Sequence, residues 1–293
     1  MKPSQLVPVL LAGLMLTACV SVPQQAPTAP VQPSTVMPVS VVTDIDDLTA
    51  VADFAAKQDQ RTLFVFDIDD TVLTAEQFFG SDYWYEWQKA KDLPNEQQVK
   101  CKFDYIALSY EAQTMKPTQA DAPAIFNAVS QPKLFLTSRS GNYRGATERE
   151  LQRNGYNFPS ALNGNSEGSI WEWKSADGAR HATLSYYHGV FMTSGQDKGV
   201  MLLHLLDRLN LRDRFDRVVL VDDGKANIDN MRNALAAARV PYQGFHYIRI
   251  DKPQPINPQL AEQAESDYDR SRSYLKEVFP GRYEELQAGR CAY

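Results

Sequence analysis

Residues 62–71 read TLFVFDIDDT. The first half, 62–66, is a short continuous run of β-branched and aromatic side chains, which is typical of a strand buried on both faces of a parallel sheet. Asp67, Asp69 and Asp70 follow it directly. Carboxylates at the end of a buried strand are costly unless a cation is bound there, because neighbouring like charges raise each other's proton affinity. Hard oxygen ligands of this kind suit Mg²⁺.

A second strand-like run, KLFLT at 133–137, ends in Thr137 and is followed by Ser138 and Arg139. Hydroxyl side chains after a strand are common in any turn, so this pattern alone assigns no role to them. Arg139 has two interpretations, because a guanidinium group either binds a substrate anion with two parallel hydrogen bonds or joins a structural ion pair.

Two more segments place charged residues next to predicted elements. Lys198 precedes VMLLHLL at 200–206, an apolar-rich helix opening, and a helix N-terminus favours negative charge nearby. The run VVLV at 218–221 predicts another buried strand, and it leads into Asp222 and Asp223. The sequence therefore predicts acids at the ends of several strands and one ammonium group at the start of a helix.

Together these segments resemble the haloacid dehalogenase-like (HAD) superfamily. Residues 66–73, FDIDDTVL, look like its first motif, Asp-x-Asp-x-Thr after an apolar strand, and the later segments match its other three motifs in order. The resemblance covers nearly all of 62–250. It implies an α/β fold with a doubly wound parallel sheet, a Rossmann-like HAD core, in which ligands collect outside the carboxyl ends of the strands.

The resemblance also implies a phosphatase mechanism. Asp67 would attack phosphorus to give an aspartyl-phosphate, and Asp69 would protonate the leaving oxygen and then activate water. Dehalogenase branches of the superfamily lack the second acid, and transport ATPases carry Lys where this chain has Ile68. Both branches are therefore disfavoured.

The other motif residues take roles by the same resemblance. Lys198 would hold the nucleophile and the transferring phosphoryl group together. The phosphate would be bound by Thr137, Ser138, Arg139 and Thr71. The Mg²⁺ ligands would come from Asp67, Asp69, Asp223 and Asp222. Asp223 is favoured as the direct ligand with Asp222 turned toward Lys198, and the two assignments remain exchangeable.

Within the superfamily, 79–84 (FGSDYW), 188–195 (HGVFMTSG) and 221–225 (VDDGK) look like signatures of a bacterial family of uncharacterised, often exported proteins. A looser likeness is to the class C acid phosphatases, which are also lipoproteins. The resemblance implies a Mg²⁺-dependent phosphomonoester hydrolase acting on a small phosphorylated molecule. The alternatives are a cell-envelope lipoprotein that uses the fold for binding or scaffolding, and a phosphotransferase.

The first residues predict export. An apolar run at 6–16 follows Lys2, and the sequence LTAC ending at Cys19 resembles the lipobox of bacterial lipoproteins. We expect 1–18 to be a signal peptide and Cys19 to carry lipid on the periplasmic face of a membrane; Val20 favours the outer membrane. Residues 19–42 are rich in Pro and predict a tether. The folded domain is expected over 43–293, opening with a helix near Thr43.

Composition limits the partners. The formal net charge is -6 and no dense Lys/Arg run is present, so nucleic acid is not an expected partner. The spacing of the Cys and His residues does not fit a zinc site. In an oxidising compartment Cys101 and Cys291 either pair or remain thiols. The sequence leaves the oligomeric state open.

Two insertions are expected in the domain. The length between 71 and 133 exceeds that of a crossover helix, so a small helical cap is predicted at about 75–130. Its aromatic residues either cover an apolar leaving group or form the cap's own core. Residues 170–187, with the turn sequence DG at 177–178, predict a β-hairpin whose Trp residues face either the pocket or the hairpin's packing.

Overall fold

The computed structural model describes residues 39–89, 93–165 and 168–293. The predicted signal segment 1–18, the predicted lipidation site Cys19 and most of the predicted tether lie outside these ranges. Among the described residues, no helix combines the length and the apolar character that crossing a membrane requires.

The central element is an eight-stranded sheet. In spatial order its strands are β1 (Ser40–Ile45), β10 (Tyr242–Tyr247), β9 (Arg217–Asp222), β2 (Thr62–Phe66), β5 (Lys133–Thr137), β8 (Val190–Met192), β7 (His181–Tyr187) and β6 (Ser169–Lys174). Neighbouring strands from β1 to β8 are parallel, and the last two pairs are antiparallel. The predicted α/β fold with a mainly parallel sheet is confirmed.

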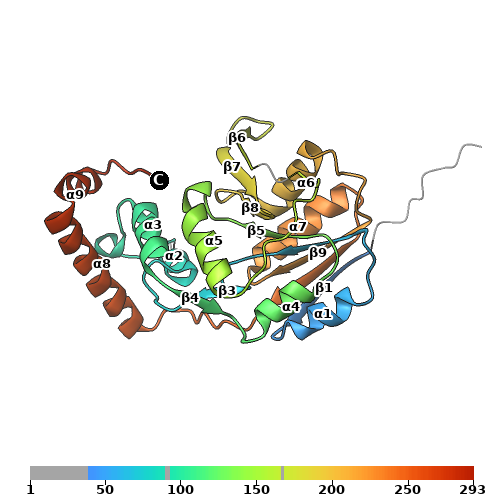
Figure 1. Ribbon diagram of the computed structural model, residues 1–293. Coiled ribbons are helices and arrows are strands. Elements are labelled where there is room, and N and C mark those ends of the chain that lie inside the picture. Colours follow the sequence, from blue (N-terminus) through green and yellow to red (C-terminus); the bar gives the residue numbers. More distant parts are fainter. Residues whose placement is uncertain (1–38, 90–92, 166–167) are drawn as a thin grey trace, which may run out of the picture. The chain divides into compact units, whose positions relative to one another are not determined.

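Helices cover both faces of this sheet (Figure 1). The core on one face includes residues of α1 (Thr49–Ala55), α4 (Ala122–Ala128) and α5 (Arg144–Arg153), and that on the other includes residues of α6 (Lys198–Arg208) and α7 (Lys225–Ala237). Alternate residues of β2 serve the two cores: Phe64 packs in the first and Leu63 in the second. This explains why β2 reads as a continuous apolar run.

The order of the strands creates a crevice beside β2. The chain runs from β2 to β5 on one side and then to β8, and α6 returns it to β9 on the other side of β2. The connections at the carboxyl ends of β2 and β9 lead to opposite sides of this strand pair, so a crevice opens between them. α/β folds bind ligands in such crevices. The acidic ends of β2 and β9 therefore share one crevice.

An insertion separates β2 from β5. It contains the antiparallel pair β3 (Leu73–Ala75) and β4 (Met115–Pro117), the helices α2 (Asp82–Gln88) and α3 (Lys102–Ala112), and a 3-10 helix (Asn95–Gln97). Ser81 caps α2 by accepting a hydrogen bond from Trp84 N at 3.1 Å. Phe79, Trp84 and Trp87 are buried, so these aromatic residues form the insertion's own core.

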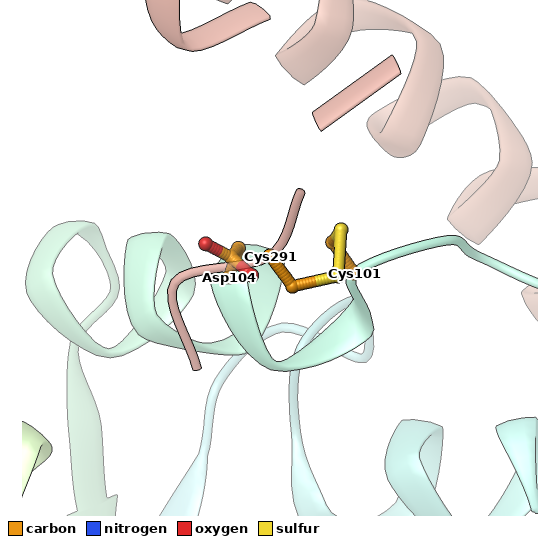
Figure 2. A group of neighbouring side chains, drawn as sticks. All are labelled: Cys101, Asp104 and Cys291. Atoms are coloured by element: carbon orange, nitrogen blue, oxygen red, sulfur yellow. A yellow bond between two sulfur atoms is a disulfide. The ribbon is translucent and has the colours of Figure 1, made fainter. Parts of the chain in front are cut away.

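Two helices for which the sequence analysis made no prediction pack against this insertion: α8 (Pro258–Val278) and α9 (Pro280–Gln287) (Figure 1). Tyr268 of α8 contacts the rings of Tyr105 and Phe79, with centroid separations of 4.9 Å and 6.5 Å. After α9 the chain returns to α3, where Cys291 and Cys101 form a disulfide with an S–S distance of 2.09 Å (Figure 2).

The hairpin prediction is confirmed. β6 and β7 pair antiparallel from Ser169 opposite Tyr186 to Lys174 opposite His181. Gly178 adopts a φ of 70°, a conformation that glycine tolerates without steric cost.

The sequence left two alternatives for the hairpin's Trp residues, which were to face the pocket or to pack within the hairpin. For Trp171 the structure shows packing. Its ring stacks on Phe191 with an interplanar angle of 11°, and its Nε1 donates to His204 Nε2 at 3.0 Å. Trp171 is therefore directed to the hairpin's packing and to α6.

The prediction that a helix begins near Thr43 is wrong. Ser40–Ile45 forms β1, parallel to β10, with Thr43 opposite Phe245, so this strand also begins inside the residues predicted for the tether, 19–42. Successive β-branched side chains favour a strand here, and pairing with β10 stabilises it against the helix. The helix starts later, at Thr49, whose N donates to Asp47 Oδ1 at 2.8 Å.

The disulfide is expected to contribute strongly to stability, because it joins residues separated by 190 positions and so restricts a long loop in the unfolded chain. Replacing both cysteines, Cys101→Ser with Cys291→Ser, should lower the free energy of unfolding by about 2–5 kcal/mol in urea titration. Reductant should shift the wild-type midpoint and leave that of the double variant unchanged. Equal midpoints for the two oxidised proteins would contradict this expectation.

Candidate active site

A buried lysine joins the two central strands. Lys198, the first residue of α6, places its Nζ 2.5 Å from Asp67 Oδ1, just after β2, and 2.7 Å from Asp222 Oδ2, at the end of β9. Its side chain is 1% exposed. Burial disfavours the charged ammonium, but the two carboxylates outweigh this effect and raise the pKa of Lys198. The structure thus brings together three residues predicted from separate motifs.

The position of Lys198 follows from the start of α6. Asp197 caps the helix, because its Oδ1 accepts from Val200 N at 3.0 Å. Gly199 lies against α7, and an added Cβ would stand 2.8 Å from Asn230 O. Glycine therefore permits the close approach of α6 to α7 that brings the lysine under the ends of the strands.

Asp222 is fully buried and fully engaged. Besides its contact with Lys198, its Oδ1 accepts from Gly224 N at 2.8 Å and from Asn227 Nδ2 at 2.9 Å. These contacts occupy both carboxylate oxygens of Asp222 without a metal. Of the two assignments left open by the sequence, the structure directs Asp222 toward Lys198.

Asp67 and Asp223 are the carboxyl groups whose ionisation is least compensated. Burial raises the pKa of Asp67 well above its ordinary value, and the neighbouring Asp222 and Asp223 raise it further against the opposing Lys198. Burial also raises the pKa of Asp223 to about 7, with Asp222 adding to the effect and Lys252 opposing it. A bound cation would favour the ionised form of both groups.

Thr71 fastens the β2 loop to Asp223. Its Oγ1 accepts from Asp223 N at 3.0 Å, a contact between residues that lie 152 positions apart. Thr71 is completely buried, which suits a bracing role for its side chain rather than direct contact with a substrate.

Asp69 forms a bidentate ion pair with Arg139. Nε and Nη2 of Arg139 lie 2.8 Å and 2.6 Å from the two carboxylate oxygens. Burial alone would raise the pKa of Asp69, but the charge and hydrogen bonds of Arg139 outweigh it, so the pKa is lowered. Asp69 is therefore ionised in this state, with both oxygens directed to Arg139 rather than to a metal position.

Arg139 is itself held on several sides. Its Nη1 donates to Thr147 Oγ1 at 2.9 Å, and the guanidinium stacks over the Tyr110 ring at 3.9 Å from the centroid. The predicted alternatives were a substrate contact and a structural ion pair, and the structure shows the ion pair. The carboxylate of Asp69 occupies the planar fork of Arg139 in this structure, and phosphate binding by Arg139 stays a prediction.

The tip of β5 lies at the same edge. Thr137 Oγ1 accepts from Arg139 N at 3.1 Å, and Ser138 O accepts from Gly195 N at 2.8 Å, which joins this tip to the loop before α6. Thr137 is buried, whereas Ser138 is exposed. Ser138 is thus the more accessible of the two predicted phosphate ligands.

Lys252 is a cation that the sequence analysis missed. Its Nζ lies 2.7 Å from Asp70 Oδ2, 2.8 Å from Asp82 Oδ2 and 2.8 Å from Asp223 Oδ2. Burial opposes its charge, but these carboxylates raise its pKa. It ties α2 of the insertion to the acidic edge of the sheet. A single lysine after the last strand gave no local signal of this role.

The acidic edge carries more negative than positive side chains. Six carboxyl groups face three cations; the acids are Asp67, Asp69, Asp70, Asp82, Asp222 and Asp223, and the cations are Arg139, Lys198 and Lys252. Oxygens of Asp67, Asp222 and Asp223 lie within 4.8 Å of one another, which suits a shared metal ion. The other close group, Asp70, Asp82 and Asp223, surrounds Lys252 instead.

A cavity of about 300 Å³ opens beside these groups. Its polar lining includes Asp69, Ser138 and Arg139, together with Asp82, Ser140, Asn142 and Ser194. Aromatic side chains also line it: Tyr85, Phe103, Tyr110, Tyr143 and Tyr293. A cavity that combines aromatic walls with a small number of polar groups is typical of a small-molecule site.

Comparison with known proteins gives a family. Residues 42–280 match the family model described as "Protein of unknown function (DUF2608)". The chain belongs to this family. No curated protein matches the chain.

The chain is also similar to solved structures of the class C acid phosphatase from Bacillus anthracis. The identity is 12% in one structure and 13% in another that has tungstate bound. Each comparison covers 75% of this chain and 84% of that chain, with a TM-score of 0.35. We draw no conclusion about activity from similarity at this level.

In this DUF2608 protein, the raised pKa of Asp223 predicts a pH-dependent stability. Between about pH 4 and 7 the folded protein retains a proton that the unfolded chain, with a carboxyl pKa of 3.8, has released, so stability should fall over this interval and level off above it. Thermal melts in EDTA between about pH 5 and 8 measure the decline and the plateau. Asp223→Asn should make the decline smaller. A midpoint that rises over this interval in the wild type would contradict the sign.

Replacing the cation at Lys252 should destabilise the fold, because Asp70, Asp82 and Asp223 would lose their shared partner. We expect Lys252→Met to lower the free energy of unfolding in EDTA by about 2–3 kcal/mol, less than for a wholly buried pair because Lys252 is partly exposed. Lys225→Met is the matched control, since Lys225 pairs with Asp229 on the exposed face of α7. Equal losses in the two variants would argue against a special role for Lys252.

Proposed function

We propose that this protein is a Mg²⁺-dependent phosphomonoester hydrolase of the HAD type, with Asp67 as the nucleophile. One observation carries the proposal: Asp67 stands at the end of the central strand, 2.5 Å from a buried Lys198 and beside Asp223, whose pKa is raised. A nucleophilic carboxylate, an ammonium group that offsets charge and a candidate metal ligand are the parts that phosphoryl transfer requires.

The donor set suits Mg²⁺. The candidate ligands are carboxylates, and the pKa values of Asp67 and Asp223 are raised, which a bound divalent cation would reverse. When bound, Mg²⁺ would supply positive charge to the transferring phosphoryl group. Asp67 and Asp223 would hold it, while Asp222 and Asp69 are directed to Lys198 and Arg139.

The reaction proceeds in two displacements. An Asp67 oxygen forms a bond to phosphorus while the ester P–O bond breaks, and the leaving oxygen acquires a proton. Water then attacks phosphorus, the bond to Asp67 breaks, and Asp69 accepts the proton from water. Lys198 keeps Asp67 oriented and offsets the charge that accumulates on the phosphoryl oxygens.

The ion pair with Arg139 suits Asp69 for the second displacement. Its lowered pKa keeps it ionised, which is the form that accepts a proton. In the first displacement Asp69 has to carry a proton to the leaving oxygen, so its contact with Arg139 has to loosen when an ester is bound. Arg139 is thereby a positioning residue for the acid and base.

We also propose that the protein works on the periplasmic face of a bacterial membrane, anchored through lipid on Cys19. The lipobox-like sequence supports this assignment. The disulfide between Cys101 and Cys291 is consistent with it, because disulfides persist in oxidising compartments.

The test is release of phosphate from p-nitrophenyl phosphate by the purified protein, with Mg²⁺ and with EDTA. Asp67→Asn should lower kcat by about 10⁴-fold or more, because it removes the nucleophile. Because the change also removes a carboxylate partner of the buried Lys198, melting temperatures measured alongside show that the variant is folded. Asp229→Asn, on the exposed face of α7, is the control and should retain activity. Full turnover by Asp67→Asn would refute the nucleophile assignment.

A further inference from the structure

The segment 288–293 is fastened to helix α3 at two consecutive residues, Cys291 and Ala292. Cys291 is bonded to Cys101, which precedes α3. Ala292 N donates to both carboxylate oxygens of Asp104, at 3.1 Å and 3.3 Å, and Arg282 of α9 pairs with the same carboxylate. Figure 2 shows Asp104 beside Cys291 and Cys101. These contacts fix the backbone immediately before Tyr293.

Tyr293 then extends into the wall of the cavity described above. Its ring lies 5.6 Å from that of Tyr143, centroid to centroid, and both residues line the cavity. Tyr85 and Phe103 of the insertion also line it. Tyr293 therefore adds an aromatic surface from a part of the chain that lies far from the catalytic residues in sequence.

We propose that Tyr293, held in place by the Cys101–Cys291 disulfide, selects phosphomonoesters whose leaving group carries a flat apolar ring. This inference rests on the proposed function, since that function places the phosphoryl group next to Asp69, which lines the cavity. The leaving group then extends away from the acidic edge, between aromatic side chains that favour stacked or edge-on rings.

The size of the cavity agrees with this occupant. An apolar cavity of roughly 150 Å³ already accepts a benzene molecule. The volume of about 300 Å³ therefore accommodates a ring with a short linker to the phosphate. A small alkyl group would leave much of the aromatic wall in contact with water, so a ring gains more on binding.

The disulfide matters because it holds Tyr293 in place before the ligand arrives. Tyr293 is 49% exposed, so packing alone constrains it weakly. Fixing the backbone at Cys291 and Ala292 lowers the conformational entropy that binding would otherwise remove. Without the disulfide, the same tyrosine would contribute less to affinity although its chemistry is unchanged.

The experiment compares benzyl phosphate with ethyl phosphate, whose alcohols are similarly poor leaving groups, and benzylphosphonate with ethylphosphonate as ligands that are not hydrolysed. The wild-type protein should prefer the benzyl compound in KM and in Kd. Tyr293→Ala should reduce this preference about fivefold, mainly through KM. Tyr293→Phe should retain it, because the ring remains.

Two further variants separate the contributions. The double variant Cys101→Ser with Cys291→Ser should weaken the preference in the same direction as Tyr293→Ala. Tyr274→Ala removes an exposed ring of α8 that does not line the cavity, and it should leave the preference unchanged. Melting temperatures measured alongside show that each variant is folded, and Tyr293→Ala tests the proposal even where the double variant does not fold.

The outcomes are distinct. A benzyl preference that survives Tyr293→Ala in both Kd and KM overturns the inference and leaves the phosphatase proposal intact. A preference in phosphonate binding that depends on Tyr293, without any release of phosphate from the esters, supports the cavity assignment and refutes the phosphatase proposal. A preference that the folded double cysteine variant retains overturns the role of the disulfide.

Discussion

The contact of the Lys198 ammonium group with Asp67 and Asp222 is the constraint on which the rest of the site depends. A buried ammonium is costly unless well-placed carboxylates compensate it. Here the carboxylates come from β2 and β9, which are neighbours only because the chain reverses its direction of strand addition at β2. The Lys198 side chain therefore depends on the sheet order, which brings the carboxyl groups of Asp67 and Asp222 together. It depends equally on the close packing of α6 on α7, which places it between them.

Each of the three cations at this edge also connects the acids to a different layer of the fold. Lys198 belongs to the helices on one face, Arg139 lies between β5 and Tyr110 of the insertion, and Lys252 joins α2 to the segment before α8. Three cations do not balance the charge of six carboxyl groups, so repulsion between the carboxyl groups remains at this edge. A protein that used this fold only for binding would gain nothing from that cost, which favours catalysis over a scaffold.

Local sequence patterns predicted the acids and Lys198 because the carboxyl ends of parallel strands meet at one edge, so position along the chain nearly determines position in space. Lys252 and Asp82 had no such signal, since only tertiary packing brings a loop after β10 and the first turn of α2 to Asp223. The predicted helix at Thr43 failed because edge-strand pairing with β10 outweighed a capping pattern. The role of Arg139 stayed ambiguous because its partner lies 70 positions away.

Helix α3 connects the Arg139–Asp69 pair with the aromatic wall of the cavity. Its residue Tyr110 packs on the guanidinium of Arg139, which holds Asp69, and the residue before the helix, Cys101, fixes the segment that carries Tyr293. A ring bound against Tyr293 and Tyr110 would therefore contact the same helix that positions Arg139. Because a close-packed interior transmits strain, an ester bound in this cavity under the proposed function would act on the contact of Arg139 with Asp69 through Tyr110. Binding of an ester in the cavity would thus also affect the contact between Arg139 and Asp69, which has to loosen before Asp69 donates a proton.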